Sequence, residues 1–297
     1  MTNVLVALKN LLDNPVSDLS AIYAEQLKDR ESKNRANSVG DYLEYYSKDL
    51  FCNTFSEHDI DEKEKIYADY LSYGGNNSNP PDFIIKKGPA IEVKKLEGFG
   101  AVPLNSSYPK DLLHNDSTLI SDDCRKCEDD IGGWQNKEMI YTIGTVKKGK
   151  LRVLWLLYGD CYAASNATYE RIRSIIKDGV NEIQGVEFAE TNELGKVMKI
   201  DPLGITDLRI RGMWDIVHPM KVFTGLTKEY KSSTDLQIYV LMLKKNYDKL
   251  PNEDKENLQK HIDSGLLEIK EVKIKNPNNT ADYLDAIFFK ASITKEE

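Results

Sequence analysis

Apolar positions follow two spacings along the chain, and together they predict a mixed α/β fold. Apolar residues three and four apart are typical of amphipathic helices, and this spacing recurs over residues 3–13, 37–50, 61–71, 168–180 and 252–264. Short runs of β-branched, aromatic and other apolar residues predict strands over residues 83–86, 90–95, 139–146, 151–158, 236–243, 266–274 and 283–293. We therefore expect a mixed central sheet flanked by helices, with additional C-terminal strands and a helix.

Three of these stretches carry more specific expectations. The run 151–158 is almost continuously apolar, as in a central strand covered on both faces, so Trp155 is expected in the core. Asn37 or Ser38 is expected to cap the helix that continues to residue 50. The helix 168–180 has an isoleucine face, expected to point inward, and a basic face, expected to point outward: Ile172, Ile175 and Ile176 against Arg171, Arg173 and Lys177.

The segment 79–95 has the pattern of a β-hairpin, with two short β-prone runs joined by a turn-forming Lys-Gly-Pro sequence. Side chains alternate along a strand, so Glu92 and Lys94 should share one face. Asp82 stands at the start of the first strand, where pairing of the two strands would bring its carboxylate close to Glu92.

Two carboxylates converging with an ammonium suit the hydrolysis of a phosphodiester. Mg²⁺ takes oxygen ligands and is usually held by one or two carboxylates plus phosphate oxygens. It polarises the phosphoryl group and generates a hydroxide nucleophile, while a lysine orients that water or offsets the charge developing on phosphorus. Asp82, Glu92 and Lys94 supply these groups. The alternative is a solvated strand face, because Glu-x-Lys recurs by chance in a chain with 30% charged residues.

Pro81-Asp82, the spacer 83–91 and Glu92-Val93-Lys94 resemble the active-site pattern of the PD-(D/E)XK nuclease superfamily. Further segments resemble type II restriction endonucleases of the NgoPII family, namely residues 32–44, 105–110, 158–163 and 201–214. The resemblance implies a PD-(D/E)XK restriction-endonuclease-like core in which Asp82, Glu92 and Lys94 are catalytic. It further implies that Asp82, Glu92 and the Val93 carbonyl bind the metal together with an acid from the preceding helix, Glu44 or, one turn earlier, Asp41.

The resemblance also implies where DNA is contacted. The loop 105–110 offers groups that suit phosphates or base edges, and its expected DNA-binding residues are Asn105, Ser106, Ser107 and Lys110. In the segment 201–214, Arg209 and Arg211 share a face if the chain is extended, and arginine is the usual reader of guanine. These arginines and Trp214 form the expected recognition segment. Without the resemblance, the same residues suit an ordinary loop and a solvated edge strand with a core tryptophan.

The expected activity is therefore Mg²⁺-dependent, sequence-specific hydrolysis of double-stranded DNA by a type II restriction endonuclease. The resemblance implies a short GC-rich palindrome, with GGCC as the candidate site, and such symmetry normally requires a two-fold homodimer. Two alternatives stay open. One is another PD-(D/E)XK nuclease that acts in repair or on particular DNA structures, and the other is a non-catalytic DNA-binding protein on a decayed nuclease fold.

Composition constrains this picture without deciding it. The chain has 297 residues, and we expect one domain with a helical N-terminal part (1–75), a catalytic core (76–180) and a recognition and C-terminal part (181–297). The net charge of −8 opposes binding to nucleic acid at face value, although the local field at the site matters more. No run of about 18 apolar residues predicts a membrane span, and the N-terminus lacks a secretory pattern, so we expect a cytoplasmic protein.

The four cysteines and two of the histidines have structural interpretations. Cys124 and Cys127 have the spacing of zinc ligands, Cys161 is a candidate third ligand, and His114 or Cys52 a candidate fourth. Because no second close pair exists, free thiols are the favoured interpretation. His218, directly before Pro219, is expected to have a structural rather than a catalytic role.

Overall fold

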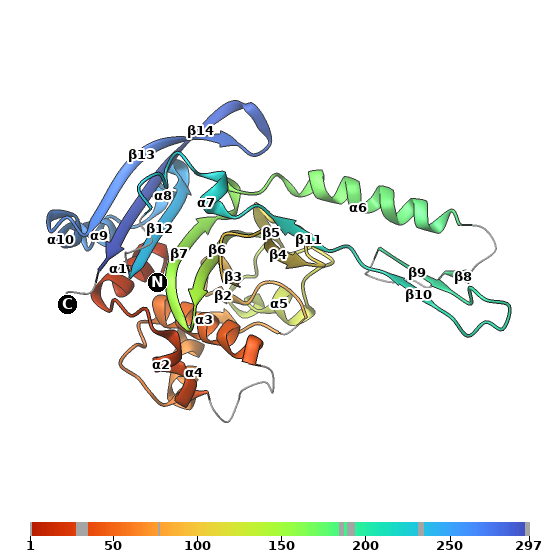
Figure 1. Ribbon diagram of the computed structural model, residues 1–297, viewed down its shortest axis with the longest axis horizontal. Helices are drawn as coiled ribbons and strands as arrows, with labels where there is room; N and C mark the ends of the chain where they lie inside the picture. Colours follow the sequence, from red (N-terminus) through yellow and green to blue (C-terminus); the bar gives the residue numbers. More distant parts are fainter. Residues whose placement is uncertain are drawn as a thin grey trace.

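A computed structural model describes residues 2–27, 35–76, 78–183, 187–188, 194–230 and 235–294. Residues 32–34 of the NgoPII-like segment 32–44 lie outside this described part, as do parts of 181–297. Within it, the main sheet has nine strands in the order β1-β2-β3-β6-β7-β12-β14-β13, with β5 paired to β6 (Figure 1). These strands are β1 (Leu71–Tyr73), β2 (Phe83–Ile85), β3 (Ala90–Leu96), β5 (Leu112–His114), β6 (Asn136–Lys147), β7 (Lys150–Tyr158), β12 (Leu236–Leu243), β13 (Leu267–Asn276) and β14 (Asn279–Ile293).

The sheet is mixed, as expected. β3 runs parallel to β6, and β7 runs parallel to β12, whereas the other neighbouring strands are antiparallel. The two central strands are the most deeply buried, because every residue of β12 and the run 153–158 in β7 lie inside the core. Trp155 is fully buried and its ring centroid lies 4.8 Å from that of Tyr239, which confirms its predicted core position.

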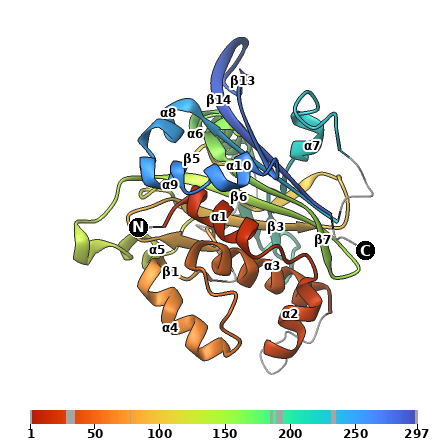
Figure 2. The ribbon, with the colours of Figure 1, turned by 90° about the vertical axis from the view of Figure 1, so that its left-hand side faces the viewer.

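The N-terminal helices gather on one side of the sheet (Figure 2). They are α1 (Val4–Asp13), α2 (Leu19–Gln26), α3 (Arg35–Cys52) and α4 (Ile60–Tyr70). The expected cap of α3 is wrong, since the helix already begins at Arg35 and Asn37 and Ser38 lie inside it. Arg35 and Ala36 are good helix formers, which allows the helix to extend past those polar residues.

A buried carboxylate joins three of these helices. Asp49 of α3 accepts hydrogen bonds at 2.5 Å from Lys63 Nζ of α4, from Tyr23 of α2 and from Tyr67 of α4. Asp49 and Lys63 are both inaccessible to solvent. A buried charge is tolerated where it is paired and hydrogen-bonded, so this cluster fixes how α2 and α4 pack around α3.

Short helices connect or flank the remaining strands: α5 (Asp122–Lys126), η1 (Asp129–Ile131), η2 (Gly159–Cys161), α7 (Pro219–Val222), α8 (Lys244–Lys249), α9 (Asn252–Glu256) and α10 (Gln259–Asp263). The single helix expected over 252–264 is interrupted, and buried Leu258 lies between α9 and α10. Within the described residues, no helix is long and apolar enough to cross a membrane.

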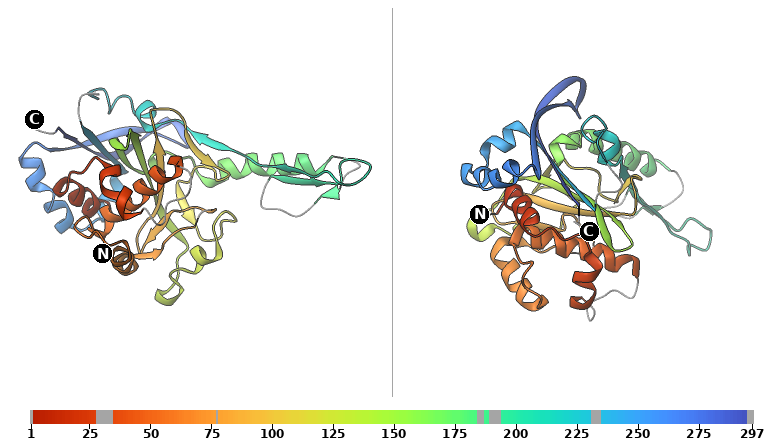
Figure 3. Two further views of the ribbon diagram at one scale, coloured as in Figure 1. Left: turned by 60° about the horizontal axis from the view of Figure 1, so that its bottom comes forward. Right: turned by 60° about the vertical axis from the view of Figure 1, so that its left-hand side comes forward.

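An arm projects from the body of the molecule (Figures 1 and 3). It consists of α6 (Asn166–Asn181) and a three-stranded sheet of β8 (Glu187–Phe188), β9 (Gly195–Met198) and β10 (Leu208–Ile210). The predicted inward face of α6 is wrong: Ile172, Ile175 and Ile176 are 38%, 58% and 41% exposed, and no residue of α6 is buried. The helix leaves the body, so no part of the main sheet covers its isoleucines.

A small two-stranded sheet joins the arm to the body. It pairs β4 (Val102–Asn105) with β11 (Trp214–Ile216), and places Trp214 opposite Asn105. Three aromatic rings pack beside it, because Tyr108 stacks on Tyr169 of α6 and both rings meet Trp214 edge-on. The loop after β4 and the chain before β11 are therefore held next to each other.

Candidate active site

Asp82 is fixed against the strand that carries Glu92. The predicted hairpin forms, with β2 antiparallel to β3 and Phe83 opposite Ile91. The backbone N–H of Asp82 donates to the Ile91 carbonyl at 3.0 Å, and the N–H of Val93 donates to Asp82 Oδ2 at 2.5 Å. The pairing of the two strands thus extends to Asp82, one residue before β2 begins. It brings the Asp82 carboxylate beside the Glu92 position, as the sequence predicted.

A glycine allows the preceding loop to approach Asp82. Gly75 has a φ of +90°, and a Cβ at this position would collide with the Asp82 carbonyl oxygen. Both the positive φ and the close approach require glycine. The loop after β1 therefore packs directly on the backbone that carries the carboxylate.

Glu92 has one satisfied and one unsatisfied carboxylate oxygen. Lys94 Nζ donates to Glu92 Oε1 at 2.6 Å, which confirms that alternation along β3 puts the two side chains on one face. Glu92 is only 7% exposed, and its Oε2 is buried with no hydrogen-bond donor among the described residues. A buried acceptor without a partner is costly, and the Glu92 carboxylate is close enough to Asp82 to raise the pKa of that group.

The electrostatics of the cluster reflect an excess of negative charge. Burial, followed by the charges of Glu92 and Glu44, raises the pKa of Asp82 to about 8, although Lys94 opposes the shift. Burial alone would lower the pKa of Lys94, but the Glu92 and Asp82 carboxylates outweigh it and raise that pKa. Lys94 is therefore a permanent ammonium at neutral pH, while Asp82 holds a proton unless another cation replaces it.

Glu44 lies within electrostatic range of this cluster but does not complete it. It raises the pKa of Asp82 from α3, yet its Oε1 accepts a hydrogen bond from Lys48 Nζ at 2.8 Å. In the part of the chain that the structure describes, no group of three or more His, Cys, Asp or Glu residues is placed to hold a metal ion. The acidic pair Asp82 and Glu92 is the part of the expected site that the fold brings together.

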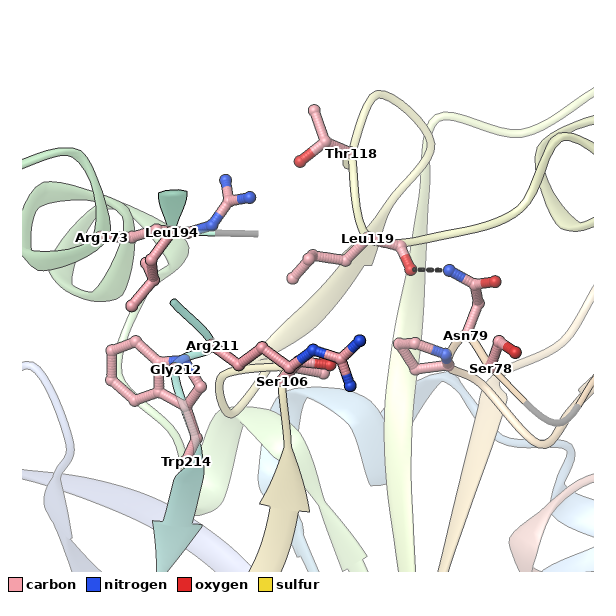
Figure 4. A pocket seen from close by; sticks show the side chains of 12 residues that line it. Ser78, Asn79, Ser106, Thr118, Leu119, Arg173, Leu194, Arg211, Gly212 and Trp214 are labelled. Carbon is pink, nitrogen blue, oxygen red and sulfur yellow. Dashed lines mark hydrogen bonds between the residues drawn. The ribbon is translucent and has the colours of Figure 1, made fainter. Parts of the chain in front are cut away.

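A pocket of about 440 Å³ is lined in part by residues that closely precede Asp82 in the sequence (Figure 4). Asn79 and Pro80, just before Pro81 and Asp82, form one wall, and the Asn79 amide donates to the Leu119 carbonyl at 3.1 Å. Ser78 belongs to the same wall, and the remaining lining residues come from five other segments of the chain: Ser106, Ser107, Thr118, Leu119, Arg173, Leu194, Arg211, Gly212 and Trp214. Small polar groups, two guanidinium groups and an indole ring therefore surround one cavity.

Two similarities to known proteins establish the family of this chain. Residues 2–275 match the family model of the NgoPII restriction endonuclease. The chain is also 41% identical over 289 residues to the type II restriction enzyme NgoPII of Neisseria gonorrhoeae, an alignment that covers 94% of this chain and 95% of that protein. The chain belongs to the NgoPII restriction endonuclease family. It is a type II restriction endonuclease related to NgoPII over nearly its full length. No solved structure matched significantly.

The structure of this NgoPII-family enzyme separates the two arginines of the expected recognition segment. Arg211 follows β10 and reaches across the pocket toward the loop that carries Ser106 (Figure 4). Arg209 lies within β10, opposite Lys196 of β9, and is not among the pocket residues. β10 ends at Ile210, so the two arginines do not belong to one continuous strand. Trp214 lines the pocket with Arg211.

The residues expected to bind DNA in and after β4 also have different environments. Ser106 and Ser107 line the pocket, and Asn105 is exposed at the end of β4 with a φ of +54°. Lys110 is 4% exposed, and its ammonium donates to Ser107 Oγ and to the Tyr108 carbonyl. Burial lowers the pKa of Lys110 to about 8, with Glu92 opposing and Lys94 adding to the shift. The Lys110 ammonium, which the sequence suggested would contact DNA, is thus buried and stabilises the loop through hydrogen bonds within it.

The pocket residues that the sequence did not assign to a site include Arg173, Asn79 and Thr118. Arg173 was assigned to a solvated helix face, and Asn79 and Thr118 were not singled out. The proximity of Asn79 to Pro81-Asp82 was an available signal for its position. Nothing local marks Arg173 or Thr118, because they join the pocket only through the packing of α6 and of the loop before α5.

The cysteines and His218 lie apart from this site. Cys124 and Cys127 are in and just after α5, Cys161 is in η2, and all four cysteines are free. His218 is buried, and its Nδ1 accepts the Met220 N–H at 3.1 Å to cap α7. Burial, aided by the charge of Lys221, lowers the pKa of His218 to about 4. The predicted structural role of His218 is confirmed.

Proposed function

We propose that Asp82, Glu92 and Lys94 form the active site of a Mg²⁺-dependent endonuclease that cleaves double-stranded DNA at a specific sequence, on a core of the PD-(D/E)XK type. The observation that carries this proposal is the buried, unpartnered Glu92 Oε2 beside Asp82, whose pKa is raised to about 8. An orphaned carboxylate oxygen and surplus negative charge are both relieved by a divalent cation, so the residues present fit the metal.

The metal ligands in this proposal are Asp82, Glu92 and the Val93 carbonyl, with Glu44 as a further acid if it exchanges its contact with Lys48. When bound, the cation polarises the scissile phosphoryl group and lowers the pKa of a coordinated water. Asp82 is held in place for this role by the Val93 N–H. Glu92 is held by Lys94, which leaves the second oxygen of Glu92 available.

Lys94 acts as a hydrogen-bond donor in this mechanism. Its raised pKa keeps it protonated at neutral pH, so it does not serve as a general base. An ammonium in this position orients the attacking water and stabilises the negative charge that develops on the phosphoryl oxygens. The proposed role therefore depends on the charge of Lys94 as well as on its position.

The pocket beside Asn79 is the proposed recognition site. Arg211 supplies a guanidinium that suits a guanine edge, and Ser106, Ser107 and Trp214 line the same space. Asn105 stands at the end of the adjoining strand. The proposed recognition sequence is a short GC-rich palindrome, with GGCC as the candidate. The proposed enzyme is a two-fold homodimer, because two symmetric active sites are needed to cut both strands of a palindrome in the same way.

Digestion of a defined plasmid tests these proposals together. With Mg²⁺ we expect discrete fragments whose sequenced ends share one palindrome, and with EDTA we expect no cleavage. Asp82→Ala, Glu92→Ala and Lys94→Ala should each abolish cleavage and retain DNA binding. Fragments without common ends would favour a structure-specific nuclease. Full activity of the three variants would favour a protein whose function does not depend on this site.

A further inference from the structure

The arm carries most of the strongly exposed large apolar side chains of the described residues. The three most exposed are Leu203 (80%), Ile205 (79%) and Met213 (70%), which lie between β9 and β11. Ile175 on α6 is 58% exposed. Large apolar side chains gathered on an exposed element are typical of an interaction surface.

These side chains are presented by ordered backbone. Asp201 Oδ1 accepts the Leu203 N–H at 3.0 Å, and its Oδ2 accepts the N–H groups of Thr206 at 2.7 Å and Ile205 at 3.2 Å. On α6, Val180 packs against Gly195 of β9, where a Cβ would lie 2.7 Å from Val180 Cγ1. One side of α6 is therefore covered by the arm's own sheet, while no element of the described part of the chain covers the isoleucine side.

The charge of the arm argues against DNA as the occupant of this surface. The whole arm, residues 166–210, contains three lysines, three arginines and eight aspartates and glutamates. Its outer part, residues 174–208, contains three lysines, no arginine and seven aspartates and glutamates. Affinity for phosphates comes from Lys and Arg, so an acidic and apolar surface is suited to protein. The basic residues Arg173 and Arg211 lie at the base of the arm, where they line the pocket.

The chain exposes more surface than a compact monomer of its mass. The chain has 15,647 Å² of accessible surface, whereas a compact monomer of 33.8 kDa exposes about 12,700 Å². The excess is roughly 2,900 Å² for one chain, whereas each subunit of an obligate homodimer buries roughly 1,000–2,500 Å², half of the 2,000–5,000 Å² total. An interface of this class would therefore cover a large part of the excess.

We propose that the arm is the contact surface between two copies of this chain. The isoleucine face of α6 and the turn that carries Leu203 and Ile205 pack against the second copy around a two-fold axis. The inference rests on the proposed function, because cleavage of both strands of a palindrome supplies the reason for two-fold symmetry. Since Arg173 belongs to α6 and Arg211 follows β10, pairing of the arms also fixes the base of the arm where the pocket lies.

Sedimentation of the full-length protein tests the inference. We expect the unchanged enzyme to be a dimer at micromolar concentration, and Ile175→Glu combined with Ile205→Glu to weaken dimerisation about 100-fold or more. Ile131→Glu is the matched control, because Ile131 is also exposed, at 42%, but lies in η1 away from the arm. This control should remain dimeric. Circular dichroism melting verifies that both variants are folded.

Hydrogen exchange on the unchanged protein gives a second measurement that needs no variant. Amides of α6 should exchange more slowly as protein concentration rises through the dimer dissociation constant. A monomer at all concentrations, or a double variant that stays dimeric, would overturn the inference. A double variant that stays dimeric and loses DNA affinity would assign the arm to DNA.

The inference and the proposed function fail in different ways. Asp82→Ala should abolish cleavage and leave the dimer intact. The double arm variant should become monomeric and convert supercoiled plasmid to the nicked rather than the linear form. A dimer that depends on the arm but cleaves no DNA would count against the proposed function alone.

Discussion

Lys94 Nζ lies 2.6 Å from Glu92 Oε1, and the other oxygen of the same carboxylate is buried without a donor among the described residues. Lys94 thus satisfies one oxygen of the Glu92 carboxylate, while the other oxygen is left without a hydrogen bond from the described residues. Such half-satisfied polar groups lower stability and are retained at functional sites. In the proposed mechanism, Lys94 therefore has a second role, which is to hold Glu92 in one orientation.

Glu92→Gln should lower the cleavage rate by about 10²–10³-fold or more with little change in DNA affinity. The amide keeps the shape of the side chain but removes a charge that the proposed cation requires. Rates on a plasmid substrate and binding in Ca²⁺ measure the two effects. Glu97→Gln is the control, since Glu97 is 84% exposed and contacts only Lys95 at 3.5 Å among its described ion pairs. Equal losses in both variants would contradict the assignment.

Asp82→Asn should stabilise the metal-free protein, and increasingly so as pH rises. The pKa of Asp82 in the folded state is about 8, against an ordinary value of 3.8. The folded state thus binds this proton more tightly than the unfolded state, and the stability that this supplies is complete below pH 3.8 and lost as pH rises through 8. Melting in EDTA at pH 5, 7 and 9 should give a Tm difference that grows with pH. A constant difference would refute the raised pKa.

Metal-dependent activity should rise with pH over the same interval. The proposed cation must displace the proton of Asp82, so its apparent affinity increases by at most about tenfold per pH unit until Asp82 is deprotonated near pH 8. Titration of cleavage with Mg²⁺ at pH 6, 7 and 8 measures this dependence. The half-saturating Mg²⁺ concentration should fall at each step, and an invariant value would exclude a proton on a metal ligand.

His218 should destabilise the protein in mild acid. Its folded-state pKa of about 4 lies below the ordinary value of 6.5, so the unfolded state takes up a proton first and stability falls as pH drops from 6.5 toward 4. His218→Asn keeps an N-cap for α7 and removes this titration. Denaturant unfolding at pH 7 and pH 5 should show a smaller loss of stability in the variant than in the unchanged protein.

Arg211→Ala should cost about 1–3 kcal/mol of discrimination at one base position, because Arg211 lines the pocket. Arg209→Ala should leave the preferred sequence unchanged, because Arg209 lies in β10 outside the pocket. Cleavage of substrates with each single substitution in the recognised sequence separates the two. The opposite pattern would move recognition from the pocket to the arm.

The hairpin that carries Asp82 and Glu92 was predictable because its geometry is local. A turn sequence, the two-residue period of a strand and the place of Asp82 at its start were sufficient to bring the Asp82 carboxylate beside Glu92, and the same period put Lys94 beside Glu92. Likewise, continuous apolar sequence identified β7 and the core position of Trp155.

The remaining features depend on packing that no local pattern records. The spacing of Ile172, Ile175 and Ile176 identified a face of α6 but not whether any element covers it. Lys110 lies in a polar loop that tertiary contacts bury. Arg173 reaches the pocket only because α6 leaves the body next to β11.

Gly144 of β6 lies opposite Lys95 of β3, and a Cβ there would sit 2.6 Å from Leu43 Cδ2. Leu43 directly precedes Glu44 in α3, so the packing of this helix on the sheet relies on the absence of a side chain at Gly144. A methyl there would have to displace the Leu43 side chain, and we expect the field of Glu44 at Asp82 to change with it. The acidity of Asp82 would thus be adjustable from an uncharged position in β6.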